Sequence, residues 1–244
     1  MNGFGRLTRG ELLRARSGSS FPLLLSYAVI VPLMALMMSG TIDGLDALAD
    51  AAATRSVFAF VASVAIGACF YGAYAYTRET YYHSLDRTLL LGTRAAVFAA
   101  KAAAGAYSGA IFGVVGLACW AVVTPIVLAA SGRAIALHPV LVATALGALL
   151  ASVLCGMIGV ALGYALRNYY LGIPVILVLP AVLAGPMLTN ARPVERYLPI
   201  GAVAGATAAP LDGLLPAPLA LLVLLGWTAA AVGAARWIDG RRSA

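Results

Sequence analysis

Six long stretches without a charged side chain or a histidine dominate this sequence. They cover residues 17–42, 56–77, 102–132, 139–166, 168–191 and 213–235. Each exceeds the roughly 20 residues that a helix needs to cross the hydrocarbon core of a bilayer. Because backbone polar groups in lipid must be hydrogen-bonded within the segment, each stretch is expected to be a transmembrane helix. The sequence therefore predicts an all-α integral membrane protein with six spans in a single domain, residues 1–244.

The composition excludes an ordinary soluble domain. Hydrophobic residues make up 62% of the chain and charged residues only 10%, whereas soluble domains carry about 25% charged residues. Cys69, Cys119 and Cys155 lie in three different spans without paired spacing, so we predict neither a disulfide nor a metal site.

The distribution of positive charge predicts the topology. With the N-terminus inside, the inner segments hold twelve basic residues and the outer segments four, the bias expected of cytoplasmic loops. The inner ones are Arg6, Arg9, Arg14, Arg16, Arg78, Arg87, Arg94, Lys101, Arg167, Arg236, Arg241 and Arg242, and the outer ones are Arg55, Arg133, Arg192 and Arg196. Both termini are then cytoplasmic. The net charge of +7 follows this topology, so we expect no nucleic-acid partner.

The first 20 residues combine four arginines with interleaved apolar side chains. This pattern is typical of a short helix in the inner membrane interface. A basic tail that only obeys the charge rule is the open alternative.

The loop 78–101 mixes both signs of charge with helical spacing. Tyr81, Leu85 and Leu89 recur on one face, and Glu79, Asp86 and Arg87 add charge around them. Gly92 is suited to end this helix, and a second helix is expected to start near Arg94. We interpret the loop as a coupling element on the cytoplasmic surface where another protein docks. The alternative is a solvated connector between two spans.

Aromatic residues cluster near the inner end of the second span. Phe70, Tyr71 and Tyr74 fit an interfacial aromatic belt, and the alternative is that they line the path of an amphipathic substrate.

Small residues repeat at helical spacing in two spans. Gly105, Gly109 and Gly113 lie in the third span, and Gly159 and Gly163 lie in the fourth. Such spacing lets helix backbones approach closely in lipid, so we expect these glycines to pack neighbouring spans together.

The segment 189–215 between the fifth and sixth spans is rich in proline and glycine. Its part 197–211 is apolar but has only 15 residues, too few to cross the membrane. A re-entrant or interfacial hairpin at the extracellular mouth fits this composition.

Several activities lack the residues they need. No ionisable residue lies near the middle of a predicted span, which argues against an ion-coupled carrier. The chain's only lysine, Lys101, is not in a phosphate-binding loop, so any ATPase activity would belong to a separate chain. His83 and His138 lie in or beside loops, and we expect no enzyme active site and no metal site.

Taken together, these features resemble the ABC-2 type family of ABC-transporter permeases, the membrane subunits of bacterial exporters. The resemblance rests on the order of features along nearly the whole chain, including the opening Glu11-Leu12-Leu13-Arg14 and the loop positions Glu79, Ser84, Leu89-Leu90 and Lys101. His83 and Thr93 stand where the family usually has glycine and proline.

The resemblance implies a permease subunit of an ATP-driven exporter in the bacterial cytoplasmic membrane. A second permease subunit, identical or different, and two ATP-binding subunits carrying ATP and Mg would complete it. Tyr81, Leu85 and Leu89 would then pack on the ATPase, while Glu79, Asp86 and Arg87 would orient it. The cargo would be amphipathic, such as a drug, antibiotic, peptide or lipid. The alternatives are an ATP-independent carrier or channel, and a membrane assembly protein that transports nothing.

Overall fold

A computed structural model of the chain describes residues 3–16, 19–82, 84–168, 170–172, 174–178 and 192–241. All regular structure in these residues is helical, as the sequence predicts. The elements are α1 (Gly3–Arg16), α2 (Ser20–Leu25), α3 (Tyr27–Met38), η1 (Ile42–Ala47), α4 (Asp50–Phe58), η2 (Ala59–Ser63), α5 (Val64–Tyr81), α6 (Leu85–Leu89), α7 (Arg94–Ala130), α8 (Val140–Leu166), the π-helix η3 (Pro174–Val178), α10 (Arg192–Glu195), α11 (Pro199–Ala206) and α12 (Ala217–Arg241).

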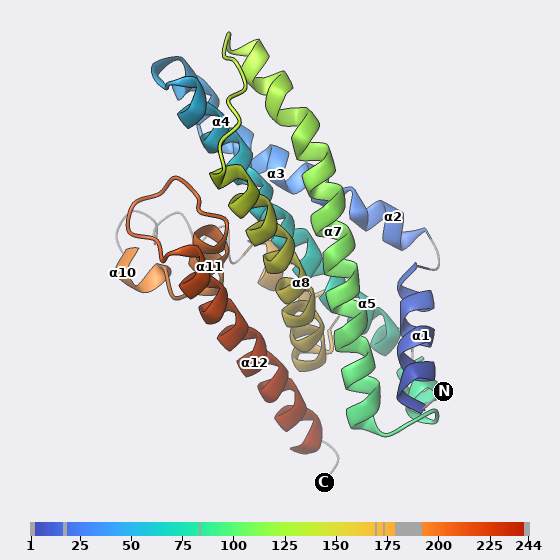
Figure 1. The fold of residues 1–244 in the computed structure, drawn as a ribbon. Coiled ribbons are helices and arrows are strands. Elements are labelled where there is room, and N and C mark those ends of the chain that lie inside the picture. The colour runs from blue at the N-terminus through green and yellow to red at the C-terminus, as the bar shows by residue number, and fades with distance from the viewer. Residues whose placement is uncertain are drawn as a thin grey trace.

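Five helices in the described residues are long and apolar enough to cross a membrane, and Figure 1 shows them as one bundle. They are Ser20–Met38, Asp50–Tyr81, Arg94–Ala130, Val140–Leu166 and Ala217–Arg241. These lengths and compositions are those of a multi-pass membrane protein, and they correspond to five of the six predicted spans. The other predicted span, 168–191, falls largely outside the described residues. The short helix η3 is the regular structure described within it.

The centre of the bundle consists of α5, α7 and α8, which touch at glycines. A Cβ atom on Gly159 of α8 would overlap the carbonyl oxygen of Cys69 on α5. A Cβ on Gly109 of α7 would likewise overlap the carbonyl oxygen of Ser152 on α8. The other glycines of the pattern lie at the same contacts: Gly105 near the Gly156 carbonyl, Gly113 near Leu149, and Gly163 near the Ala73 carbonyl. Backbone-to-backbone packing of this kind holds helices together where lipid removes most of the hydrophobic gain.

The helices α3 and α12 flank this centre and bury much less surface. We compare the buried share of the most apolar 18 residues in each span. This share is 17% in α12, 56% in α8 and 61% in the span that ends with α5. Side chains such as Met37 and Leu222 point away from the bundle. The centre is therefore tightly packed and the two flanking helices are loosely attached.

The end of the bundle that carries α1, α6 and the end of α12 is called the inner end here, because the charge distribution predicts that it is cytoplasmic. At about 1.5 Å per residue, the 37 residues of α7 span about 55 Å, well beyond a hydrocarbon core of about 30 Å. Its first turns pack against α1 through Leu7, Val97 and Ala100, and α1 runs beside them in Figure 1. The predicted N-terminal helix is present, and its position in the membrane interface stays a prediction.

Among the described residues between η3 and α12, the helix α11 packs into the bundle. Ala202 and Ala206 of α11 are buried, and α11 contacts α8 and α12. Residues 179–191, which include the start of the predicted segment 189–215, lie outside the described part of the chain. That residues 197–211 are re-entrant stays a prediction.

We expect Gly159→Ala to destabilise the protein, because the added methyl group meets the backbone of α5 rather than a movable side chain. Overpacking of this kind costs roughly 1–3 kcal/mol. The matched control is Gly226→Ala on α12, where a Cβ meets nothing within 4 Å. The midpoint of thermal unfolding in detergent should fall for the first variant and stay or rise for the second; equal midpoints would contradict the packing role of Gly159.

Candidate functional site

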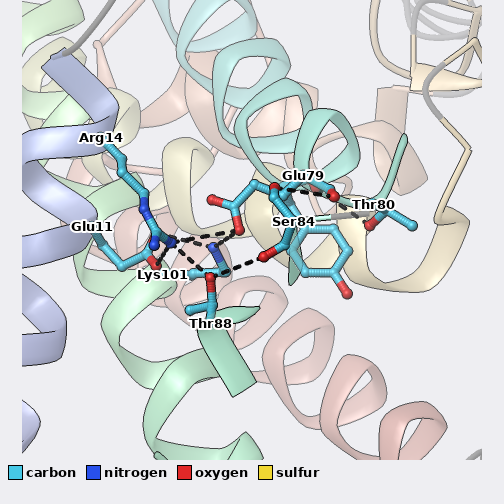
Figure 2. A network of polar contacts seen from close by, with 8 residues as sticks. Glu11, Arg14, Glu79, Thr80, Ser84, Thr88 and Lys101 are labelled. Atoms are coloured by element: carbon cyan, nitrogen blue, oxygen red, sulfur yellow. Dashed lines mark hydrogen bonds and ion pairs between the residues drawn. The ribbon is translucent and has the colours of Figure 1, made fainter. Parts of the chain in front are cut away.

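A buried group of charged side chains connects α1, α5 and α7 at the inner end (Figure 2). The Lys101 Nζ of α7 donates to Glu79 Oε2 of α5 at 2.7 Å and to Glu11 Oε2 of α1 at 3.0 Å. The three side chains are only 5%, 10% and 7% exposed, respectively. One ammonium group therefore holds two carboxylates from helices far apart in the sequence.

Arg14 completes the charge balance of this group. Its Nη1 donates to Glu11 Oε1 at 3.1 Å and to the buried Thr88 Oγ1 of α6 at 2.7 Å, and lies 3.9 Å from Glu79 Oε2. Two carboxylates and two cations give a net charge of zero. We call Glu11, Arg14, Glu79, Thr88 and Lys101 the inner charge network.

Three members lie where their own helices alone would not favour them. Glu79 occupies the last turn of α5, where the helix dipole disfavours a carboxylate. Lys101 and Glu11 lie on otherwise apolar helix faces beside Leu7 and Val97. A buried charge is tolerated only when an opposite charge and hydrogen bonds compensate its desolvation. The tertiary contacts of the network supply that compensation.

The short helix α6 is fixed to this network and to α1. The backbone amide of Ser84 donates to the Glu79 carbonyl at 3.0 Å, and Thr88 accepts from Arg14. Leu89 packs with Leu7 and Val97 between α1 and α7. The helix α6 is therefore connected by direct contacts to the ends of α1, α5 and α7.

A groove of about 400 Å³ opens beside the network, between α1 and the end of α6. Its lining residues are Arg6, Leu7, Gly10, Glu11, Arg14, Thr88, Leu90 and Leu91. Leu90 and Leu91 are 87% and 68% exposed. Since the charges of Glu11 and Arg14 are balanced within the inner charge network, Arg6 gives the groove its positive charge, and the leucines make it partly apolar.

The predicted coupling residues separate into buried and exposed groups. Glu79 is buried in the network and Leu89 is half-buried against α1, whereas Tyr81 and Arg87 are exposed. The side chains of Leu85 and Asp86 lie outside the described part of the structure. The exposed members and the groove form the surface that is open to a partner.

The predicted substrate-path aromatics pack in the bundle interior. Phe70 and Tyr71 are 8% and 5% exposed, Tyr74 is half-buried, and the Tyr71 hydroxyl donates to the Ala15 carbonyl at 2.7 Å. The cavity beside Tyr71 measures about 20 Å³, room for roughly one water molecule. A substrate path at these residues stays a prediction and would require the helices to separate.

The roles of Glu11, Arg14, Thr88 and Lys101 in one network were not predicted, although the sequence holds a signal for two of them. Lys101 is the only lysine of the chain, and Glu11 is the only acidic residue before Asp43. Isolated charges of opposite sign on apolar helices indicate partners for each other. Among the described residues, no group of three or more His, Cys, Asp or Glu side chains is arranged to hold a metal ion.

We expect Lys101→Met to destabilise the protein by about 3–5 kcal/mol, because it leaves two carboxylates buried without their cation. The triple variant Glu11→Gln, Glu79→Gln, Lys101→Met should lose less than the single one, since all three charges disappear together. Thermal unfolding in detergent measures both effects. Arg9→Met, on the exposed side of α1, serves as the control and should change little. A triple variant less stable than the single one would contradict the network.

Comparison with known proteins returns no match to a protein-family model, a curated protein or a solved structure. The resemblance to ABC-2 type permeases therefore gains no support from sequence or structural similarity. The function is argued below from the residues and contacts of the chain itself.

Proposed function

We propose that this chain is the permease subunit of an ATP-driven ABC exporter in the bacterial cytoplasmic membrane. It would form a path for an amphipathic substrate together with a second permease subunit. ATP would be hydrolysed on separate ATP-binding subunits that dock at the inner end.

The inner charge network carries this proposal. A transporter driven by a separate ATPase needs a surface element that the ATPase binds and displaces. It also needs a rigid connection from that element to the membrane spans. The helix α6 is at the surface, and Thr88 ties it through Arg14 and Glu11 to Lys101 on α7. Lys101 in turn holds Glu79 at the end of α5. A solvated connector does not need two carboxylates and an ammonium buried against its ends.

The composition of the exposed surface supports a protein partner at this end. Leu90, Leu91, Tyr81 and Tyr82 are all more than half exposed around α6. Large apolar side chains gathered at one end indicate an interaction site. Beside them, the groove supplies the positive charge of Arg6. We infer that the partner presents an acidic and apolar segment to this surface.

The chain's own residues support the assignment of ATP hydrolysis to a partner. The sequence lacks a glycine-rich phosphate-binding loop, and Lys101, which such a loop would need, is committed to two carboxylates.

Filling the groove tests the proposed docking surface. Gly10 lines the groove and a Cβ there meets nothing within 4 Å, so Gly10→Leu should fit the fold while occupying the groove. Gly5→Leu on the same helix is the matched control, because its Cβ is equally unobstructed but lies outside the groove lining. Both changes raise helix propensity equally.

The measurement is co-purification with an ABC ATP-binding subunit encoded beside the gene, and stimulation of its ATPase activity. We expect Gly10→Leu to weaken binding about tenfold or more, a loss of ~1.4 kcal/mol, and Gly5→Leu to behave as wild type. Equal binding by both variants would remove the groove from the docking surface. Transport in vesicles by the purified chain without an ATP-binding subunit would overturn the proposed function itself.

A further inference from the structure

Three charged residues at the inner end occupy positions that their own helices disfavour. Asp239 lies in the last turn of α12, where the helix dipole repels a carboxylate. Arg94 is the first residue of α7, where the dipole repels a cation. Arg167 caps α8 with a φ of 48°, the left-handed conformation in which glycine is usual.

The three residues meet at one carboxylate oxygen. Arg167 Nη2 donates to Asp239 Oδ1 at 2.9 Å, and Arg94 Nη1 lies 3.7 Å from the same oxygen. The Asp239 side chain is 16% exposed, so the closer ion pair is largely shielded from water. Locally unfavourable residues that compensate one another across three helices indicate a contact that the fold depends on.

The contact adds a polar attachment to the inner half of α12, which otherwise packs through the small or partly buried side chains of Ala231, Val232 and Ala235. Ala235 is the one residue between 229 and 241 that is fully buried. A Cβ on Gly233 or Gly240 would meet nothing within 4 Å. Small side chains bury little apolar area, so they contribute little to the attachment of this half of the helix.

The same contact reaches the coupling element. The loop from α6 ends at Thr93, the residue before Arg94. The Thr93 side chain caps α7 by accepting a hydrogen bond from the Ala96 amide at 3.3 Å. Lys101 of the inner charge network lies two turns further along α7. The start of α7 is therefore held on one side by α1 and α5 and on the other by α8 and α12.

We propose that the Arg94–Asp239–Arg167 contact is a clamp that makes the inner half of α12 follow the start of α7. When the start of α7 shifts, Asp239 carries the shift into α12, the span with the smallest buried share. This inference concerns the fold of the chain itself and holds whether or not the proposed function is correct.

Hydrogen exchange of the purified protein in lipid nanodiscs, followed by mass spectrometry, tests the clamp. We expect Asp239→Asn to speed amide exchange in residues 229–241 roughly two- to fivefold, the range expected when a partly exposed ion pair is lost. Arg236→Gln removes one exposed charge from the same helix and should leave exchange unchanged. Arg94→Gln, a milder change at a half-exposed side chain, should give a smaller increase in the same residues.

Transmission is tested by a second pair of variants. Thr93→Ala removes the cap of α7. As a single substitution it should speed amide exchange in residues 229–241. In the Asp239→Asn background it should add nothing there, because the connection is already broken. Additive effects, or no response of residues 229–241 to Asp239→Asn, would overturn the clamp.

Discussion

The ammonium group of Lys101, buried between Glu11 and Glu79, is the interaction on which the inner end of this protein depends. Removing three charges from water costs several kcal/mol each, and their mutual attraction at 2.7 and 3.0 Å, together with the nearby Arg14, offsets that cost. Because each charge needs the others, α1, α5 and α7 are fixed relative to one another at this point. The network therefore specifies one arrangement of the inner ends rather than adding much net stability.

The bundle has a closely packed centre, formed by α5, α7 and α8, and two flanking helices, α3 and α12, that are less buried. In α5, α7 and α8 the backbones touch at Gly109 and Gly159, where even a methyl group has no room. The helices α3 and α12 bury a small share of their surface within the chain. The helix α6 is attached to the central helices α5 and α7. In the clamp that we propose, the contact of Asp239 with Arg94 and Arg167 connects α7 and α8 to α12. The proposed function, a membrane subunit moved by a separate ATPase, would use this division.

Much of the fold follows from the sequence, and less of the site. The charge-free stretches predict the spans because lipid forces each apolar stretch into a helix. The loop 78–101 was predicted to hold one helix through Tyr81, Leu85 and Leu89 and a second helix from near Arg94. The second begins at Arg94 as predicted, but Tyr81 is the last residue of α5 and α6 covers only Leu85–Leu89. Its charged residues were all assigned to the surface, yet Glu79 turns inward to Lys101. Helical spacing shows which residues share a face of one helix but does not show which other helix covers that face.

The sequence by itself determined that this chain is helical, spans a membrane several times and carries its positive charge at one end. These properties depend on single residues in contact with lipid or water, so local composition is enough to set them. Only the tertiary structure decided which charges are paired. Glu11 and Lys101 are 90 residues apart, and Arg94 and Asp239 lie on different helices, so the energy of each pair depends on a distance and a burial that exist only once the helices have packed.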